Sequence, residues 1–503
     1  MKHNLIIGIS VLPALLIMPA VADTVSSRQV ISENTTYNNL VAENIASTTA
    51  NNGGVFYMQD VPDVTLLFDG ETLFVGNSLN DGGMGGAIGN GWLSSISGSG
   101  YTQGGKIVFD GKSIFDGNTT NNQNGGGAIF NYGNGTAANP DVVFIGATTF
   151  NENKATTASN SVFAGGGAIN HRSGMIVFND TATFVGNESA SRGGAIIAGG
   201  DVIFNSTAEF SGNTAATNGG AMAILGGDVL FEKTANFVNN SATGASAIFI
   251  DESGSQLTFK DAANFINNTG VGTLLNNNST GSVSFANGVN FTGNTNNLNG
   301  ALVNSGTISV SGGDMIFASN IGSNGGGLKS SGTLTVNTSG SVSFTSNSTS
   351  SSAGALENSG NLALTSKSVL FANNSSNSGY GGAIFNVSDT TVSGTENVFR
   401  GNIARDTGTV KSGGGAIHNR GNNSTTTLII GTNSSTNLFE SNVSSAHGGA
   451  IVARAFDGAG QDSDIVINGA TRFVNNSATL NGGAIWNAVA ESGGTTGESN
   501  IVF

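Results

Sequence analysis

Two groups of aspartates come closest, in residue type and spacing, to a catalytic or metal-binding site. They are Asp60, Asp63 and Asp69, and Asp457, Asp462 and Asp464. Paired carboxylates catalyse acid–base chemistry at glycosidic bonds, and clustered carboxylates bind calcium. The second group lies in an insertion, AFDGAGQDSD, that we expect to protrude as a loop. A solvated acidic loop is the better interpretation of both groups, and a carbohydrate-active site is the alternative.

The histidines and cysteines do not suggest a further site. No His-x-x-x-His spacing occurs, and the chain has no cysteine, which excludes a thiolate metal site or a Cys nucleophile. Arg172 and Arg420 each follow a histidine and stand at equivalent places in two distant segments, where we expect surface turns. We therefore predict no catalytic residue, no cofactor and no metal.

Irregular insertions are the better candidates for binding, because loops on a rigid scaffold often carry function. The largest runs from about Gly89 to Gly105 and contains Trp92 and Tyr101. These aromatic residues are candidates for holding a sugar ring or a host protein, although Trp92 could simply cover the structure beneath it. Further insertions run from about Tyr132 to Pro140, Lys154 to Gly165, Ile403 to Gly413 and Ala455 to Asp464.

The elements that must position these insertions form a repeat. A Gly-Gly-Ala-Ile tetrad or a degenerate copy of it begins at Gly53, Gly85, Gly126, Gly166, Gly193, Gly219, Ala245, Gly272, Asn299, Gly325, Ala353, Gly381, Gly414, Gly448 and Gly482. From Gly166 to Gly381 the copies are about 27 residues apart. A Phe-x-x-Asn motif, such as Phe184 to Asn187, precedes nearly every tetrad, and in many units a second Phe lies six residues upstream.

The pattern within one unit predicts β-strands. In the segment Ile107–Phe109 the two outer residues share one face, and before the second Phe a small apolar residue alternates with a polar one. Period-two alternation indicates strands with one buried face. Three short apolar pieces in each unit favour an all-β fold, a right-handed parallel β-helix (solenoid) of about 15 coils with three short strands per coil.

Stacked coils give each repeated residue a fixed place. The Phe columns should fill the interior, and the Asn of Phe-x-x-Asn should take a left-handed turn conformation and bond to the Asn above and below. A second Asn column follows the tetrad: Asn90, Asn131, Asn277, Asn304, Asn358, Asn386, Asn419 and Asn487. The glycine pair suits a tight turn or a close approach of neighbouring coils.

The charge of the chain argues against nucleic acid as a binding partner, and its N-terminal residues predict export from the cytoplasm. The chain of 503 residues carries 17 basic and 32 acidic residues, a net charge of −15, whereas nucleic-acid binders present basic patches. Residues 1–22 have a basic start, an apolar run and an Ala-x-Ala site, which together predict a cleaved signal peptide. We expect residues 23–50 to form an N-terminal cap region and residues 51–503 to form a parallel β-helix repeat domain that is truncated at its C-terminal end.

The ordered pairing of Phe-x-x-Asn with Gly-Gly-Ala-Ile resembles the repeats of the chlamydial polymorphic outer membrane proteins and of related autotransporter passengers. The resemblance implies a β-helix passenger with adhesive roles, in which Phe-x-x-Asn copies such as Phe184/Asn187 and Phe473/Asn476 are tied to host-cell binding. Two features depart from the family. This chain lacks cysteine, and it stops at SNIVF, where another coil should begin, so we expect a missing translocator.

Together these observations predict an adhesin-like passenger that is not an enzyme. Its expected partners are a host-cell or cell-surface protein or glycan, and the outer membrane through the missing translocator, with no nucleic acid. Its expected location is the cell outer membrane surface or the extracellular space. The alternatives are a carbohydrate-active β-helix enzyme and a purely structural surface rod.

Overall fold

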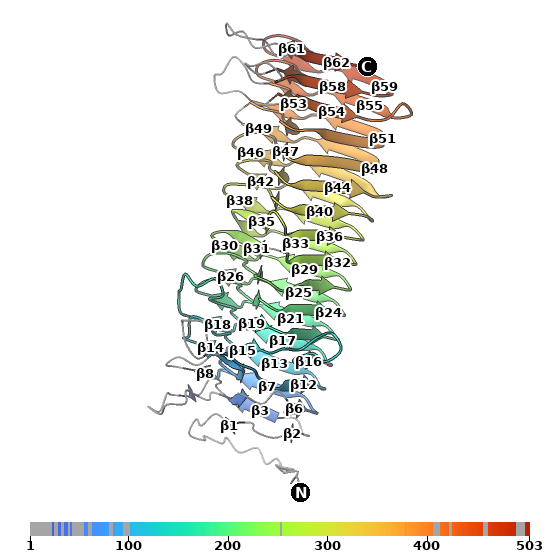
Figure 1. Cartoon of the computed structure of the whole chain (residues 1–503). Coiled ribbons are helices and arrows are strands. Elements are labelled where there is room, and N and C mark those ends of the chain that lie inside the picture. The colour runs from blue at the N-terminus through green and yellow to red at the C-terminus, as the bar shows by residue number, and fades with distance from the viewer. Residues whose placement is uncertain are drawn as a thin grey trace. The chain divides into compact units, whose positions relative to one another are not determined.

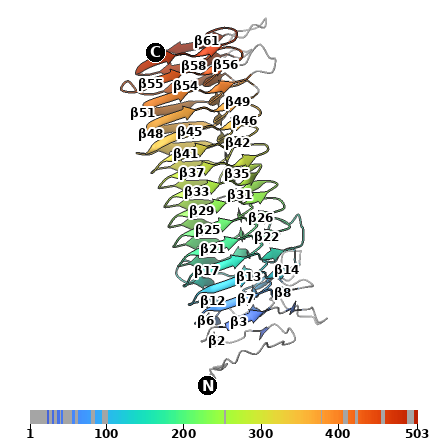
Figure 2. The same ribbon diagram turned by 180° about the vertical axis from the view of Figure 1, so that it is seen from behind.

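A computed structural model describes residues 23–24, 29–31, 35–38, 41–42, 55–58, 63–79, 84–93, 101–251, 254–377, 379–405, 413–421, 425–455, 461–488 and 498–503. The chain divides into two compact units, Met1–Lys260 (unit 1) and Asp261–Phe503 (unit 2). Within each unit, strands pair in parallel with the equivalent strands of neighbouring coils, in chain order (Figures 1 and 2). The predicted all-β parallel β-helix is confirmed. The expected signal peptide, residues 1–22, lies outside the described residues.

One coil contains four strands in three sheets, one strand more than the sequence predicted. The Phe sheet takes two strands per coil, each containing one of the repeated apolar pieces. A two-residue strand directly after the Asn of Phe-x-x-Asn builds the short sheet, and the tetrad leads into a strand of the GGAI sheet. In one coil of unit 1 these strands are β20 (Met175–Phe178), β21 (Ala182–Val185), β22 (Glu188–Ser189) and β23 (Ile196–Ala198).

The Phe sheet of unit 1 is regular. Its other first strands are β2 (Gln29–Ile31), β6 (Thr65–Phe68), β12 (Lys106–Phe109), β16 (Val142–Phe144), β24 (Asp201–Phe204), β28 (Val229–Phe231) and β32 (Gln256–Phe259). Its other second strands are β3 (Thr35–Asn38), β7 (Thr72–Val75), β13 (Ser113–Asp116), β17 (Thr148–Asn151), β25 (Ala208–Ser211) and β29 (Ala235–Val238). The expected cap region therefore contains β2 and β3, which pair in parallel with the next coil.

Two further sheets complete unit 1. The rest of the short sheet is β4 (Val41–Ala42), β8 (Ser78–Leu79), β14 (Thr119–Thr120), β18 (Lys154–Ala155), β26 (Thr214–Ala215) and β30 (Ser241–Ala242). The rest of the GGAI sheet is β1 (Asp23–Thr24), β5 (Phe56–Met58), β9 (Ile88–Asn90), β15 (Ile129–Tyr132), β19 (Ile169–Ser173), β27 (Met222–Ile224) and β31 (Ala245–Ile250). A separate hairpin is formed by β10 (Trp92–Leu93) and β11 (Tyr101–Thr102).

In the Phe sheet of unit 2 two strands run through both Phe positions without a break, β48 (Asn361–Ala372) and β51 (Thr390–Arg400). The separate first strands are β36 (Ser282–Phe285), β40 (Thr307–Val310), β44 (Thr333–Asn337), β54 (Thr426–Ile430), β58 (Ser463–Ile467) and β62 (Ser499–Val502). The separate second strands are β33 (Ala263–Ile266), β37 (Val289–Thr292), β41 (Met315–Ala318), β45 (Ser341–Thr345), β55 (Thr436–Glu440) and β59 (Ala470–Val474).

The other two sheets of unit 2 follow the plan of unit 1. The short sheet is β34 (Thr269–Gly270), β38 (Thr295–Asn296), β42 (Ile321–Gly322), β46 (Ser348–Thr349), β49 (Ser375–Ser376), β52 (Ile403–Ala404), β56 (Val443–Ser444) and β60 (Ser477–Ala478). The GGAI sheet is β35 (Gly272–Asn276), β39 (Leu302–Asn304), β43 (Leu328–Ser330), β47 (Leu356–Asn358), β50 (Ile384–Asn386), β53 (Ile417–Arg420), β57 (Ile451–Arg454) and β61 (Ile485–Ala488). No helix among the described residues has the length and apolarity of a membrane span.

The interior of unit 1 contains two columns of stacked phenylalanines. Phe184 stacks on Phe210 with ring centroids 4.7 Å apart and planes 2° from parallel, which matches the spacing of neighbouring strands in a sheet. The two columns meet edge to face, as Phe178 and Phe184 do at 5.8 Å and 80°. Stacked and edge-to-face contacts are both favourable arrangements of aromatic rings. The predicted inward placement of the rings is confirmed.

Unit 2 keeps one of the two aromatic columns. Its second strands continue the stacking, for example between Phe371 and Phe399 at 5.1 Å and 3°. At the upstream position Phe285 is followed by aliphatic residues that pair one above another: Val310, Val336, Leu364, Val392, Ile430 and Ile467. Since both units coil in the same way, the fold requires an apolar side chain at this position and not specifically an aromatic one.

Candidate functional site

The Asn of Phe-x-x-Asn forms a continuous hydrogen-bonded ladder within each unit. The backbone N and the Nδ2 of Asn187 both donate to Oδ1 of Asn213, at 3.0 and 2.9 Å. The same Nδ2 also donates to the carbonyl oxygen of Phe150, one coil earlier. Oδ1 of Asn187 accepts the same two bonds from Asn153. Both donors of the Nδ2 amide and both lone pairs of the oxygen are therefore used.

The left-handed turn lies one residue before the ladder, and the expectation that Asn itself adopts it is wrong. The residue preceding each ladder Asn has φ between 51° and 67°. These residues are Gly76, Gly117, Glu152, Gly186, Gly212, Asn239, Asn267, Gly293, Ser319, Ser346, Asn373, Gly401, Ser441 and Asn475. Because the turn conformation belongs to its neighbour, the motif needs Asn for the amide hydrogen bonds.

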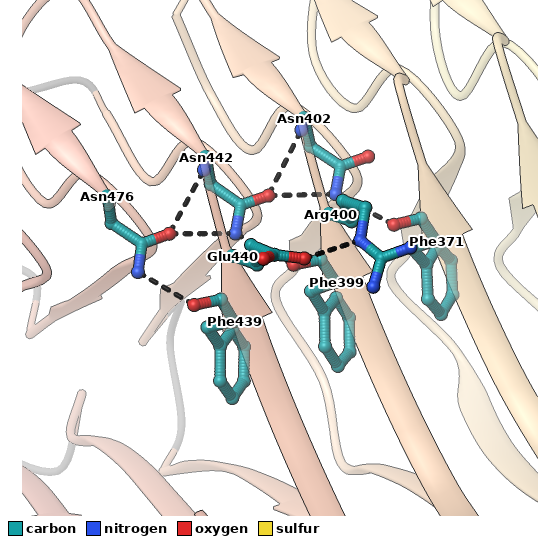
Figure 3. A network of polar contacts seen from close by, with 8 residues as sticks. All are labelled: Phe371, Phe399, Arg400, Asn402, Phe439, Glu440, Asn442 and Asn476. Carbon is teal, nitrogen blue, oxygen red and sulfur yellow. Dashed lines mark hydrogen bonds and ion pairs between the residues drawn. The ribbon is translucent and has the colours of Figure 1, made fainter. Parts of the chain in front are cut away.

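The structure places the predicted Phe-x-x-Asn site residues inside the coil. Phe184 and Asn187 are fully buried, so an outside ligand could reach their side chains only if the coil opened. Phe473 and Asn476 are half-buried. Figure 3 shows Asn476 as the last rung, accepting from Asn442 and donating to the carbonyl of Phe439 at 2.8 Å. Their contact with a host ligand stays a prediction that the structure does not test.

The two glycines of the tetrad have different structural roles. Gly193 has φ of 60°, a conformation that favours glycine. Gly194 lies against the next coil, and a Cβ on it would overlap the carbonyl oxygen of Gly220. The first glycine therefore makes the turn, and the second allows neighbouring coils to approach each other.

The second Asn column is also a buried ladder, with one register different from the prediction. In β35 the rung is Asn276 and not Asn277, because Asn276 pairs with Asn304 and its Nδ2 donates to Oδ1 of Asn304 at 3.3 Å. The degenerate tetrad before it accordingly begins at Val271, one residue earlier than predicted. This column changes residue type along the coils, since His171 continues it after Asn131.

His171 and His418 are both fully buried, so the expectation of surface turns at these histidines is wrong. Nδ1 of His171 lies 3.0 Å from Nδ2 of Asn131, and its Nε2 lies 3.1 Å from the carbonyl oxygen of Asp201. Because an amide nitrogen and a carbonyl are the two partners, the neutral ring accepts at Nδ1 and donates from Nε2. Burial lowers the pKa of His171 to about 4.

His418 lies on the outer side of the GGAI sheet, among aromatic rings. Its ring centroid is 5.1 Å from that of Tyr380 and 5.6 Å from that of Phe385. The guanidinium of half-buried Arg420 lies over Phe385 at 5.2 Å. Burial lowers the pKa of His418 to about 3. This cluster packs the surface of the sheet, so Arg420 is not the simple turn residue that its spacing suggested.

The largest predicted insertion begins and ends as an antiparallel hairpin. Strands β10 and β11 pair Trp92 with Thr102 and Leu93 with Tyr101. Residues 94–100, and the side chains of Trp92 and Tyr101, lie outside the described part of the chain. The hairpin is joined to the coil at its base, where Nδ2 of Asn90 donates to the carbonyl oxygen of Gly105 at 2.9 Å.

A second insertion lies beside the hairpin in the next coil. The N–H of Gly104 donates to the carbonyl oxygen of Tyr132 at 3.0 Å. The loop that follows Tyr132 is fixed by the buried carboxylate of Asp141, which accepts from the N–H groups of Gly135 and Met175 at 2.7 and 2.8 Å. Burial raises the pKa of Asp141, and these hydrogen bonds oppose the shift. We call the paired strands β10 and β11 and the loop of residues 133–140 the insertion surface.

Of the remaining insertions, Lys154 to Gly165 is described throughout and the two later ones only in part. In the Lys154 to Gly165 insertion the Phe163 ring packs under the guanidinium of Arg172 at 4.5 Å. Residues 406–412 and 456–460, which make up most of the two later insertions, lie outside the described residues. The insertion surface stays the candidate, because it contains the predicted residues Trp92 and Tyr101.

The described members of the two acidic groups do not converge. Oδ1 of Asp462 accepts the N–H of Glu498 at 2.7 Å, and Oδ1 of Asp464 accepts from Nδ2 of Asn500 at 2.9 Å. Asp63 and Asp69 are exposed, whereas Asp60 and Asp457 lie outside the described residues. Among described residues, no group of three or more His, Asp or Glu is placed to hold a metal ion. Two of the best-formed hollows have volumes of about 210 and 180 Å³, below the usual range for small-molecule sites.

Two stretches of the chain, residues 368–387 and 470–488, match the family model of the Chlamydia polymorphic membrane protein repeat. These two stretches are similar to polymorphic membrane protein repeats. Each runs from a Phe-x-x-Asn strand of the Phe sheet, through the short sheet, to the GGAI sheet. No curated protein and no solved structure matches the chain. Each matched stretch is therefore one passage across all three sheets.

Proposed function

We propose that this protein is an exported adhesin-like passenger that binds a host-cell or cell-surface protein or glycan through its insertions. Its polymorphic membrane protein repeats and its β-helix fold support this proposal. The repeated Phe and Asn side chains are occupied with one another in the interior, as Phe184 and Asn187 are. Ligand contacts therefore fall to the surface, where the insertions interrupt the regular coils.

The observation that carries the proposal is the antiparallel hairpin β10–β11, set into coils that otherwise pair in parallel. The two glycines that follow β11 fix the hairpin to the coils. The carbonyl of Gly105 accepts from Asn90, and the N–H of Gly104 donates to Tyr132 of the neighbouring coil. A loop presented by a rigid scaffold loses little conformational freedom on binding. Trp92 and Tyr101 remain the candidate contact residues, because aromatic side chains supply much of the binding energy at interfaces.

Deletion of Trp92 to Tyr101 tests the proposal. Attachment of the labelled protein to cultured host cells should fall, while the thermal unfolding midpoint stays close to that of the parent chain. Removing residues 406–412, an insertion of unit 2, is the matched control and should leave attachment unchanged. Full attachment by the first deletion, with normal unfolding, would remove the insertion surface from the binding site.

The carbohydrate-active alternative has less support. Asp462 and Asp464, the described pair of the second acidic group, bond to neighbouring coils. Asp141, the buried carboxylate of the insertion surface, is engaged by backbone N–H groups. Both arrangements serve loop geometry, and neither presents two facing carboxylates to a glycosidic bond. We propose that the chain is not an enzyme.

Export through cleavage after residue 22, and outer-membrane attachment through a segment beyond Phe503, complete the proposal. Both rest on the sequence. N-terminal sequencing of the mature protein should begin at Asp23, and reading the gene past Phe503 should reveal the translocator. A mature protein that starts at Met1 would contradict the proposed export.

A further inference from the structure

The same arrangement of side chains occurs once in each unit, on the outer side of the GGAI sheet. Asn170 and His418 occupy the second position of β19 and of β53, directly after the Ile of a tetrad. Both side chains are fully buried. Asn170 bonds to the carbonyl oxygen of Gly165 at 2.9 Å, and His418 bonds to that of Gly413 at 3.2 Å. Each of these glycines directly precedes its tetrad and has a positive φ, of 117° and 136°.

Each of the two buried side chains keeps one hydrogen-bond acceptor without a donor. Nδ2 of Asn170 donates to the carbonyl oxygens of Phe163 and Gly165, both at 2.9 Å, and Oδ1 has no partner among the described residues. In His418 the bond to a carbonyl fixes the proton on Nδ1, so that Nε2 is an acceptor, and Nε2 has no described partner either. A buried acceptor without a donor destabilises a fold. Its occurrence at the same position of two coils indicates a use other than folding.

An arginine follows each of these side chains by two residues and lies over a phenylalanine ring. The guanidinium of Arg172 is 4.5 Å from the ring centre of Phe163, and that of Arg420 is 5.2 Å from the ring centre of Phe385. Both arginines are half-buried, so part of each is exposed. Half of the eight arginines of the chain lie on this side of the GGAI sheet in one unit or the other: Arg172, Arg192, Arg420 and Arg454. Because the chain has a net charge of −15, this side of the sheet concentrates its few positive charges.

A second arginine joins the arrangement in unit 1. Nη1 of Arg192 donates to the carbonyl oxygen of Val162 at 3.0 Å, and no ion pair among the described residues includes Arg192. Val162 directly precedes Phe163, which Asn170 and Arg172 both contact. The three polar side chains therefore surround one end of the insertion between β18 and β19. We call Asn170, Arg172 and Arg192 the first arginine site, and His418 and Arg420 the second arginine site.

Acidic residues in the segments that adjoin the first arginine site have partners of their own. Glu188 forms an ion pair with Lys154 at 3.0 Å. The carboxylate of Asp141 accepts two backbone N–H groups, and Oδ1 of Asp201 accepts the N–H of Asp228 at 2.9 Å. The charge of Arg192 therefore stays available to an anionic ligand.

The insertion beside the first arginine site offers further contacts in a fixed geometry. The N–H of Ser159 donates to Oγ of Ser191 at 2.9 Å, and the N–H of Ser161 donates to Oγ of Ser159 at 3.1 Å. Asn160 and Ser161 are exposed, and Val162 is 40 % exposed. An amide, a hydroxyl and an apolar side chain thus lie together at the surface. Because the insertion is already fixed by hydrogen bonds, it loses little conformational freedom when a ligand binds.

We propose that both arginine sites bind the carboxylate of an acidic sugar residue, a uronic or a sialic acid, in a cell-surface glycan. The guanidinium fork matches a carboxylate in geometry and in charge. The hydroxyl groups of the sugar ring supply the donor that Oδ1 of Asn170 lacks, directly or through a bridging water. Because Asn170 is fully buried, the half-buried ring of Phe163 shifts to admit this donor. An aspartate or glutamate side chain brings a carboxylate without a neighbouring hydroxyl, so the observations favour a sugar over an acidic peptide.

Saturation-transfer NMR of the purified full chain with 3′-sialyllactose, and separately with a hyaluronan hexasaccharide, tests the proposal. At least one of the two sugars should bind, with a Kd of about 1 mM, and the two arms tell a terminal sialic acid from a uronic acid within a chain. The matched neutral sugars, lactose and the carboxyl-reduced hexasaccharide, should bind about ten-fold more weakly or less. Binding of neither acidic sugar, or equal binding of an acidic sugar and its neutral counterpart, would overturn the proposal. Stronger binding of a hexa-aspartate peptide would overturn it in favour of an acidic protein.

Variants of the arginines locate the binding. Arg172→Gln and Arg420→Gln should each reduce the binding of the acidic sugar, and the two together should weaken it about ten-fold or more. Arg472→Gln, which removes the same charge from an exposed position of β59, is the matched control and should leave binding unchanged. Thermal unfolding shows whether each variant is folded. Equal effects of the control and the double variant, with both folded, would contradict the assignment to the arginine sites.

The cell surface as the source of the sugar rests on the proposed function, whereas binding of the sugar in solution does not. If deletion of Trp92 to Tyr101 leaves cell attachment intact while 3′-sialyllactose or the hexasaccharide still binds, the hairpin fails and the arginine sites stand. If the deletion abolishes attachment and neither sugar binds the parent chain, the arginine sites fail and the hairpin stands.

Discussion

The backbone N and the Nδ2 of Asn402 both donate to Oδ1 of Asn442, at 3.0 and 2.9 Å (Figure 3). The two residues are 40 positions apart in the chain and adjacent in the fold. The nearby ion pair between Arg400 and Glu440, at 2.6 Å, joins the same two coils at the surface. The buried amide bonds contribute more than the exposed ion pair, which solvent screens.

Replacing one ladder Asn with Asp should destabilise unit 1 strongly. In Asn213→Asp the carboxylate loses both Nδ2 donors, so the carbonyl of Phe184 loses this donor and Oδ1 of Asn240 keeps only the backbone N–H of residue 213. The loss of two buried hydrogen bonds together with a buried charge should cost about 3 kcal/mol or more. Denaturant unfolding followed by circular dichroism measures the loss.

The exposed residue Asn205 provides the control for that substitution. Its Nδ2 donates to Asn179 in the same inter-coil manner, but at the surface. Asn205→Asp should change stability by about 0.5 kcal/mol or less. Similar costs for the two variants would show that burial of the ladder does not matter.

Removing one ring from an aromatic column should leave a cavity that the stacked neighbours cannot fill. Phe237 is fully buried and stacks on Phe210 at 4.9 Å. Phe237→Ala should cost about 3–5 kcal/mol in the free energy of unfolding. Ile145→Ala, at a position 43 % exposed, is the control and should cost much less. An unchanged unfolding midpoint for Phe237→Ala would contradict the packed interior.

The glycines of the repeat should differ sharply in tolerance. Gly194→Ala places a methyl group against the backbone of the next coil and should cost about 3 kcal/mol. Gly212 has φ of 65° and no atom within 4 Å of its potential Cβ. Gly212→Asn should cost less than about 1 kcal/mol, because asparagine already occupies the equivalent position at residue 239. Thermal unfolding of the two variants compares these costs directly.

The stability of unit 1 should fall as the pH falls from about 6.5 to about 4. Burial lowers the pKa of His171 in the folded chain to about 4, below its ordinary value of 6.5, so between these values the unfolded chain binds a proton that the folded chain does not. Protonation of Nδ1 would also turn it into a donor facing Nδ2 of Asn131. His171→Asn should flatten the dependence of the unfolding midpoint on pH within this window. An equally steep dependence in the variant would assign it to other titratable groups.

The sequence by itself determined the repeat, the strand faces and the class of fold. These depend on residues close together in the chain: the two-residue alternation in Ile107–Phe109 shows which side is buried, and the spacing of the tetrads sets the length of a coil. The buried Asn ladder was predictable too, because the motif recurs in fixed order. Its precise chemistry was not, since the left-handed residue before the Asn and the acceptor carbonyl of Phe150 become apparent only when coils stack.

Tertiary structure alone decided what each surface presents. The register of β35 made Asn276 the rung, and the coils buried His171 and His418 at positions that local spacing suggested were turns. Contacts between coils join residues about 27 or more positions apart, and the register that sets those contacts belongs to the folded chain.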